Sequence, residues 1–246
     1  MSHTRKHAAA GCRRLGFGAA AVAATLACAG AGALAYALVT APAPPPQPTK
    51  AQAGALSVHA KAKSSAPEPL ALSASKPVSL RIPSIGVDAP VDMLGLNADG
   101  SVQVPAQPMH AGWYADSASP GQLGAAVLLG HVDFYTTGPA VFYSLGSLNP
   151  GAAITVVRQD GTGATFTVTA VREYPKSDFP TAEVYYAPGD SAQLRLVTCG
   201  SWDSDKHAYT GNTVAFATLT SVTLPAGASP RAGAPPPRAV AHPRPQ

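Results

Sequence analysis

The sequence has little cysteine, little charge and few aromatic residues. Of its 246 residues, three are cysteines, 12% are charged and 7% are aromatic. Cys12 and Cys28 lie in the first 30 residues, so Cys199 is the one thiol in the rest of the chain. This excludes an intramolecular disulfide beyond residue 30. A lone thiol there is a reactive group, one half of an intermolecular disulfide or a small buried hydrophobic residue.

Charge is absent from residues 15–49, directly after a basic N-terminal segment, 1–14. The apolar stretch 15–41 is long enough to cross a hydrocarbon core of about 30 Å as a helix. We therefore expect a transmembrane signal-anchor at 15–41, with 1–14 in the cytoplasm and a single-pass topology in the plasma membrane. The alternative is a cleaved signal peptide with small-residue sites near Ala33 or Ala37. Either way, the remaining chain is extracellular.

Two further segments lack aromatic residues and any apolar period. Residues 42–77 and 225–246 are rich in Pro and Ala, a composition that does not bury enough surface to offset its ordering entropy. We expect a disordered linker at 42–77 and a disordered tail at 225–246. One domain remains, 78–224, which is long enough for a sizeable core. It holds six Lys/Arg against twelve Asp/Glu, a net charge of −6, so a nucleic-acid partner is not expected. Its carboxylates form no recognisable metal-binding pattern.

No segment of this domain shows a sustained helical period. Short β-branched runs separated by turn residues predict strands instead. The predicted strands are 78–82, 85–91, 101–105, 125–130, 153–158, 165–171, 193–198 and 213–219. Asp160-Gly161 predicts a hairpin turn between the fifth and sixth of these. Short helical turns are expected near 139–145 and 179–185. The pattern indicates an all-β barrel or sandwich of about eight strands.

Two of these predicted strands are followed directly by residues that could take part in catalysis. His131 follows the apolar run AAVLLG, and Cys199 follows LRLVT. A cysteine nucleophile acts as the thiolate, which a nearby histidine can stabilise. His110 and His207 are the other histidines of the domain, and both lie in loop-like stretches where we expect solvated or packing roles. A histidine at a strand end is more often structural than catalytic, so the residues alone leave both interpretations open.

Five stretches, in order, resemble the sortases, the cysteine transpeptidases of the Gram-positive cell surface: RIPSIGVDAPV, LLGHVD, FYSLGSLNPGAAITV, LRLVTCG and NTVAFA. The Cys-Gly pair followed by W-D and Y-x-x-N is most similar to the class F sortases of actinobacteria. The resemblance implies an eight-stranded β-barrel with His131 as acid/base and Cys199 as acyl-thioester nucleophile. It implies that surface proteins with an LPxTG-like C-terminal sorting signal are the substrates. It also implies an amine acceptor, from a peptidoglycan precursor or a lysine, and no cofactor or metal.

The sequence departs from the sortase pattern in one respect. Sortases carry an arginine on the strand after the cysteine, whereas this chain has none between Cys199 and Leu224. Asn212 stands near that position and can donate hydrogen bonds to an oxyanion without charge. Thr198, Lys206 and Arg195 are the other candidates, Arg195 because strand alternation places it on the face of Cys199. The departure keeps two alternatives open, a sortase-fold hydrolase and a sortase-like binding module with little or no activity.

Overall fold

The computed structural model describes residues 43–54, 70–186 and 189–225. The predicted anchor at 15–41 and nearly all of the tail at 225–246 lie outside these ranges. Within them, no helix has both the length and the apolar character needed to span a bilayer.

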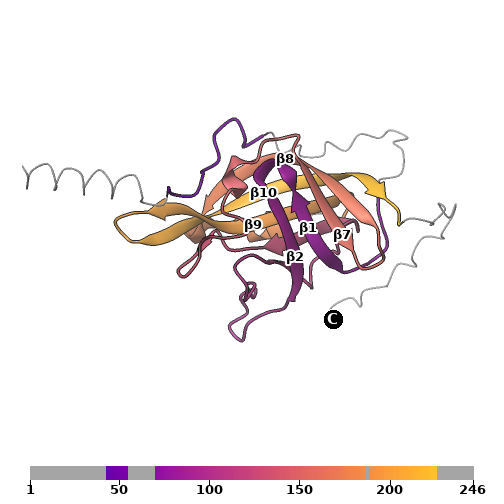
Figure 1. Cartoon of the computed structure of the whole chain (residues 1–246), viewed down its shortest axis with the longest axis horizontal. Helices are drawn as coiled ribbons and strands as arrows, with labels where there is room; N and C mark the ends of the chain where they lie inside the picture. Colours follow the sequence, from indigo (N-terminus) through magenta and orange to yellow (C-terminus); the bar gives the residue numbers. More distant parts are fainter. Residues whose placement is uncertain (1–42, 55–69, 187–188, 226–246) are drawn as a thin grey trace, which may run out of the picture. The chain divides into compact units, whose positions relative to one another are not determined.

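Eight strands close into an all-β barrel in the order β1-β2-β3-β4-β9-β10-β8-β7 (Figure 1). This confirms the predicted all-β, eight-stranded architecture. The strands are β1 (Pro77–Ile82), β2 (Val87–Leu94), β3 (Ala111–Tyr114), β4 (Gly124–Leu129), β7 (Ala153–Arg158), β8 (Gly163–Pro175), β9 (Ala192–Asp203) and β10 (Ala208–Thr223). A separate two-stranded sheet pairs β5 (Asp133–Phe134) with β6 (Gly138–Pro139). The helical elements in these ranges are short: η1 (Pro83–Ile85), η2 (Leu145–Ser147), η3 (Lys176–Asp178) and α2 (Thr181–Tyr185).

The hairpin between β7 and β8 forms where the sequence predicts it. Gly161 has a φ of 80°, a conformation that glycine adopts at little steric cost. The Asp160 carboxylate accepts the backbone N–H of Thr162 at 3.0 Å, which stabilises the turn. β8 and β10 extend well beyond their predicted ends, because their mutual pairing continues from Gly163 to Pro175. β9 also runs past its predicted end at residue 198, because its pairing with β10 continues to Asp203, so Cys199 lies within the strand rather than after it.

One predicted strand is wrong. The run 101–105 forms only an isolated bridge between Leu96 and Val102. The barrel uses β3 (AGWY) instead, which pairs in parallel with β2 and antiparallel with β4. All four β3 residues are buried. Its small and aromatic side chains therefore show no polar alternation that would reveal it as a strand.

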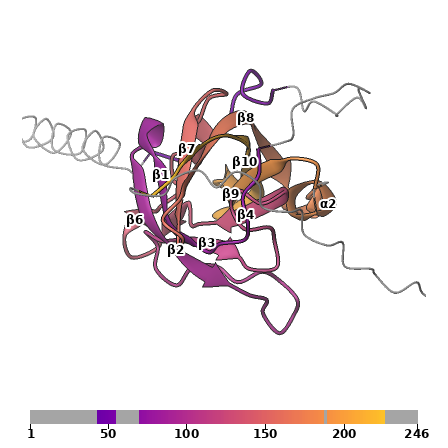
Figure 2. The same cartoon turned by 90° about the vertical axis from the view of Figure 1, so that its right-hand side faces the viewer.

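The barrel has an apolar cluster on each face of its wall. The inner cluster fills the barrel and includes Leu128, Leu196 and Ala215. The neighbouring residues Val127, Val197 and Val214 point the opposite way and belong to an outer cluster that also contains Val184 of α2. Figure 2 shows α2 on the outside of the barrel beside β4 and β9. The segment after β8 therefore covers part of the outer wall.

Of the predicted linker 42–77, the structure describes residues 43–54 and 70–77. Residues 44–54, which we call the N-terminal strap, lie against the barrel. Gln52 is buried, and its Nε2 donates to the carbonyls of Gly146 and Leu148 at 3.0 and 2.6 Å. Arg172 on β8 donates to Ala53 O at 2.7 Å. The prediction of an unpacked spacer is therefore wrong for the strap, because a glutamine in a Pro/Ala-rich segment finds long-range backbone partners.

Candidate active site

His131 follows the end of β4, and Cys199 lies within β9, just past the point where its pairing with β4 stops. β4 and β9 pair in parallel, with Leu129 opposite Val197 as the last pair. The backbone N–H of Gly130 then donates to Val197 O at 3.1 Å, which continues the ladder by one residue. Adjacent strands are about 4.8 Å apart. The next residues along, His131 just after β4 and Cys199 within β9, therefore lie side by side.

Thr198 of β9 bonds directly to the residue that follows β4. Its Oγ1 donates to Gly130 O at 2.8 Å, and its side chain is buried on the inner face. Gly130 is itself tightly packed, since a Cβ there would lie 2.6 Å from Phe142 Cδ2 and 2.7 Å from Val141 Cγ1. Thr198, a sequence candidate for substrate contact, thus holds the residues that precede His131 and Cys199.

The His131 ring is oriented by two contacts. Its Nε2 lies 2.9 Å from Pro105 O, and because a carbonyl only accepts, Nε2 carries the proton in this contact. The Phe134 ring packs against the imidazole edge to face, with centroids 5.5 Å apart. Nδ1 is then the ring nitrogen left for proton exchange. The sequence gives no signal for Pro105, which reaches the site from a loop 26 residues upstream.

Cys199 is a free, half-buried cysteine on the outer face of β9. It shares this face with Val197 by strand alternation. Asn212 of β10 stands directly across from it in the ladder. The Asn212 side chain is half-buried and makes no hydrogen bond to another residue in the described ranges. An uncharged donor is therefore available next to the thiol.

Arg195 lies on the same face as Cys199 but away from it. Four residues of strand separate them, about 13 Å at roughly 3.3 Å per residue. The Arg195 side chain is only 5% exposed, and its guanidinium lies over the Phe216 ring, 4.7 Å from the centroid. Burial lowers the pKa of Arg195 to about 10. Its Nη1 donates to Leu194 O at 3.2 Å. The structure thus places Arg195 in the outer cluster rather than beside the thiol.

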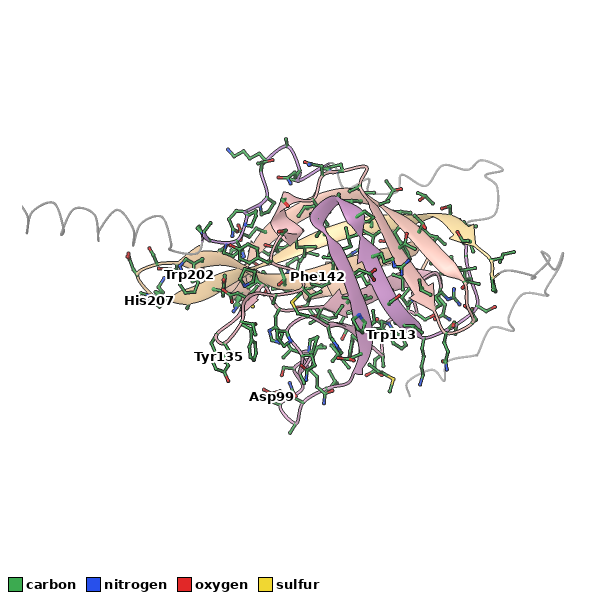
Figure 3. The ribbon with its side chains drawn as sticks, viewed as in Figure 1. Asp99, Trp113, Tyr135, Phe142, Trp202 and His207 are labelled. Carbon is green, nitrogen blue, oxygen red and sulfur yellow. The ribbon has the colours of Figure 1, made fainter. Side chains whose placement is uncertain are left out.

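Lys206 lies in the turn between β9 and β10, at the far end of that hairpin. Its Nζ donates to Asp203 Oδ2 at 2.7 Å, and its side chain is largely exposed. His207 lies in the same turn, with its ring 6.5 Å from the Trp202 ring (Figure 3). The remaining histidine, His110, is paired through Nδ1 with Asp92 at 3.0 Å. None of these three contacts involves His131 or Cys199.

A second hydrogen bond near the site is not predictable from the sequence. The Tyr209 hydroxyl donates a short hydrogen bond to Asp133 Oδ2, which ties β10 to the loop that follows His131. Burial raises the pKa of Tyr209, and the bond to Asp133 and the nearby Cys199 thiol add to the shift. Tyr209 belongs to the Y-x-x-N pattern, but nothing in the sequence pairs it with Asp133.

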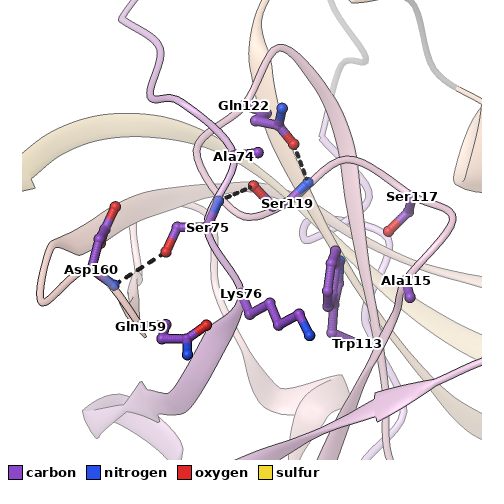
Figure 4. A pocket seen from close by; sticks show the side chains of 10 residues that line it. All are labelled: Ala74, Ser75, Lys76, Trp113, Ala115, Ser117, Ser119, Gln122, Gln159 and Asp160. Atoms are coloured by element: carbon purple, nitrogen blue, oxygen red, sulfur yellow. Dashed lines mark hydrogen bonds between the residues drawn. The ribbon is translucent and has the colours of Figure 1, made fainter.

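A cavity lies elsewhere on the barrel. It has a volume of about 620 Å³, and Trp113, Lys76, Gln122 and Asp160 are among the residues that line it (Figure 4). Gln122 precedes β4, so this cavity opens near the end of β4 opposite His131. No three His, Cys, Asp or Glu side chains of the described segments converge in a way that could hold a metal ion.

Comparisons with known proteins identify the family. The family profile of the sortase domain matches residues 80–220, more than half of the chain. Among solved structures, the chain is similar to sortase A from Corynebacterium diphtheriae, with 21% identity, a TM-score of 0.46 and coverage of 61% of this chain and 63% of that one. It therefore spans less than two thirds of that protein. It is also similar to the SrtA sortase from Actinomyces oris, with 19% identity, a TM-score of 0.49 and coverage of 68% and 93%. No curated protein matches the chain.

The matched region runs from within β1 to within β10 and takes in the whole barrel between them. It also includes His131 and Cys199. By the sortase domain match, the chain belongs to the sortase family.

Proposed function

We propose that this sortase is a cysteine transpeptidase that cleaves an LPxTG-like C-terminal sorting signal and transfers the cleaved protein to an amine. The observation that carries the proposal is the parallel pairing of β4 and β9, fixed by the bond from Thr198 Oγ1 to Gly130 O. It brings the domain's one thiol beside a histidine whose ring is already oriented by Pro105 O. A nucleophile, a proton carrier and a group that orients the carrier are the parts that thiol acyl transfer requires.

The residues divide the chemistry as follows. The Cys199 thiol passes its proton to His131, Sγ attacks the carbonyl carbon of the scissile peptide bond, and the carbonyl oxygen gains negative charge. Of the four candidates, Asn212 stands directly across the ladder from Cys199, and it donates to that oxygen through its amide. His131 gives a proton to the departing amine as the carbon–nitrogen bond breaks, which leaves an acyl-thioester on Cys199. A second amine then attacks the thioester and releases the thiol.

The finer assignment is a class F sortase held in the plasma membrane with its catalytic domain extracellular. The Cys-Gly, W-D and Y-x-x-N patterns support the class, and the basic residues before 15–41 support the orientation. Surface proteins with C-terminal sorting signals are then the donors. Amines of the cell wall, from a peptidoglycan precursor or a lysine, are the acceptors.

The test compares single variants on a fluorescent LPxTG peptide. Cys199→Ala should abolish both cleavage and the acyl-enzyme mass adduct. His131→Ala should reduce the cleavage rate by about a hundredfold or more, within the range for loss of a general acid–base group. His207→Ala, which alters a histidine of the hairpin turn, is the matched control and should retain activity. Unchanged cleavage in Cys199→Ala would refute the assignment.

Because the residue opposite Cys199 is the uncharged Asn212, two alternatives to the transpeptidase are tested as well. In a sortase-fold hydrolase, water would resolve the thioester, and added amine would not enter the product. In a sortase-like binding module, the peptide would bind without any adduct on Cys199. Product analysis with and without added amine, together with intact-protein mass spectrometry, separates both from the transpeptidase.

A further inference from the structure

A carboxylate lies beside the proposed catalytic pair and is held in a fixed position. Asp133 follows His131 by two residues, at the start of β5. Its Oδ2 accepts the hydroxyl of Tyr209, whose pKa is sensitive to the nearby Cys199 thiol. The other oxygen, Oδ1, makes no hydrogen bond to a residue in the described ranges. One oxygen of Asp133 is therefore fixed by the protein, while the other is free for a ligand.

Aromatic rings flank this carboxylate on two segments. Trp202 packs against Tyr209 with ring centroids 4.9 Å apart and is 41% exposed. Phe134 packs against Tyr135 with centroids 4.8 Å apart, and Tyr135 is 91% exposed. Figure 3 shows Tyr135 and Trp202 at the same end of the molecule. The bond between Tyr209 and Asp133 connects the two segments. Exposed rings of this size attract cations to their faces.

The combination fits one reactant of the proposed reaction. A primary amine acceptor is an ammonium ion at neutral pH, and it must reach the thioester on Cys199 and give up protons near His131. We propose that Asp133, held by Tyr209 and flanked by Trp202 and Tyr135, is the docking site for the cationic acceptor amine. This inference rests on the proposed transpeptidase function and names the chemistry of its second substrate. The net charge of −6 over residues 78–224 favours the approach of such a cation.

The step balances with the groups present. The docked ammonium loses one proton to the His131 imidazole and becomes a nucleophilic amine. Its nitrogen bonds to the thioester carbonyl carbon as the Sγ–carbon bond breaks. The nitrogen loses its second proton to the departing sulfur, so that a Cys199 thiol and an amide result. Asp133 takes part in no bond change and acts only by binding the charged acceptor.

A purely structural role predicts different kinetics. If the link from Asp133 to Tyr209 only braced the loop that carries His131, its loss would slow thioester formation as well as aminolysis. A docking role leaves thioester formation unchanged and affects only cationic acceptors. Thioester formation and aminolysis are measured separately, so the two roles are distinguishable.

The experiment uses the full chain with an LPxTG peptide as donor. Two acceptors are compared at neutral pH: the ε-amine of N-acetyl-lysinamide, which is cationic, and hydroxylamine, which is mostly neutral. For Asp133→Asn we expect the half-saturating concentration of the lysine acceptor to rise about tenfold, the loss typical of one charge-assisted contact. The rate of thioester formation and the use of hydroxylamine should change less than about twofold by the same argument. Tyr209→Phe should shift the lysine acceptor in the same direction, because it releases Asp133.

Asp205→Asn is the matched control, because it removes the same charge from an exposed position of the neighbouring hairpin turn. It should leave both acceptors unaffected. An equal loss for both acceptors, or slower thioester formation in Asp133→Asn, would show that Asp133 is a brace and overturn the docking site. An unchanged lysine acceptor would overturn it as well. Absence of any thioester in the unaltered chain would instead refute the proposed function, and the docking site with it.

Discussion

The bond between Thr198 and Gly130 offers the sharpest test of how the site is held together. Thr198→Val keeps the side-chain shape but removes the hydroxyl that donates to Gly130 O at 2.8 Å. That carbonyl has no other hydrogen-bond donor in the described segments. Leaving one buried acceptor unpaired costs about 1–3 kcal/mol. With a urea m-value of about 1–3 kcal/mol per molar, we expect the unfolding midpoint to fall by about 1 M.

Activity should fall as well, because the bond fixes the spacing between β9 and the end of β4. A displacement of about 1 Å at a reacting group can cost about a hundredfold in rate. We therefore expect thioester formation to slow by at least about tenfold in Thr198→Val. The measurements are urea unfolding followed by intrinsic fluorescence and the rate of acyl-enzyme formation by mass spectrometry.

Thr198→Ser is the matched control, since it keeps the hydroxyl and removes one methyl group. Its stability loss should be near 0.8 kcal/mol, about the value of one buried methylene, and its rate should stay close to that of the unaltered chain. If Thr198→Val proves as stable and as fast as Thr198→Ser, the bond neither stabilises the barrel nor positions the site.

Three other changes test separate parts of the structure. Gln52→Ala should lower the free energy of unfolding by about 1–3 kcal/mol, because two carbonyls lose their strap donor, while Lys50→Ala on the exposed side of the strap should be neutral in the same urea titration. Gly130→Ala should destabilise by about 1–3 kcal/mol through overpacking and slow acylation, whereas Gly189→Ala, with no neighbour within 4 Å, should do neither. Because the pKa of Tyr209 is raised in the folded protein, its protonated hydroxyl contributes stability that is fully present below the unfolded tyrosine pKa of about 10. This contribution is lost as the pH rises through the folded pKa. Tyr209→Phe should therefore show a smaller loss of stability above about pH 10 than the unaltered chain, and an equal loss would contradict the assignment.

Much of the barrel is predictable because its signals are local. Strand alternation and the Asp160-Gly161 turn identify the β7–β8 hairpin, and the apolar runs before His131 and Cys199 locate β4 and β9. β3 is not predictable in this way, because it is buried on both faces and so lacks alternation. The packing of the strap is equally hidden, since Gln52 binds carbonyls more than 90 residues away.

The candidate site, too, is only partly predictable from local sequence signals. His131 and Cys199 are recognisable from the apolar runs that precede them and from the sortase resemblance, although the residues alone do not pair them. The contacts of His131 with Pro105 and of Asp133 with Tyr209 span 26 and 76 residues, and no short pattern encodes either. Arg195 shows the limit of alternation, which assigned its face correctly but not its burial beneath the outer cluster.

The parallel pairing of β4 and β9 also determines when the thiol can become reactive. Such a pairing requires a long crossover, here residues 130–191, and contacts of this range form late in folding. Until then, Cys199 has no histidine beside it to accept its proton. Under the proposed roles, nucleophilic power appears only in copies whose barrel has closed. Under the same roles, incompletely folded or damaged molecules carry an unreactive thiol, and acylation is limited to folded molecules.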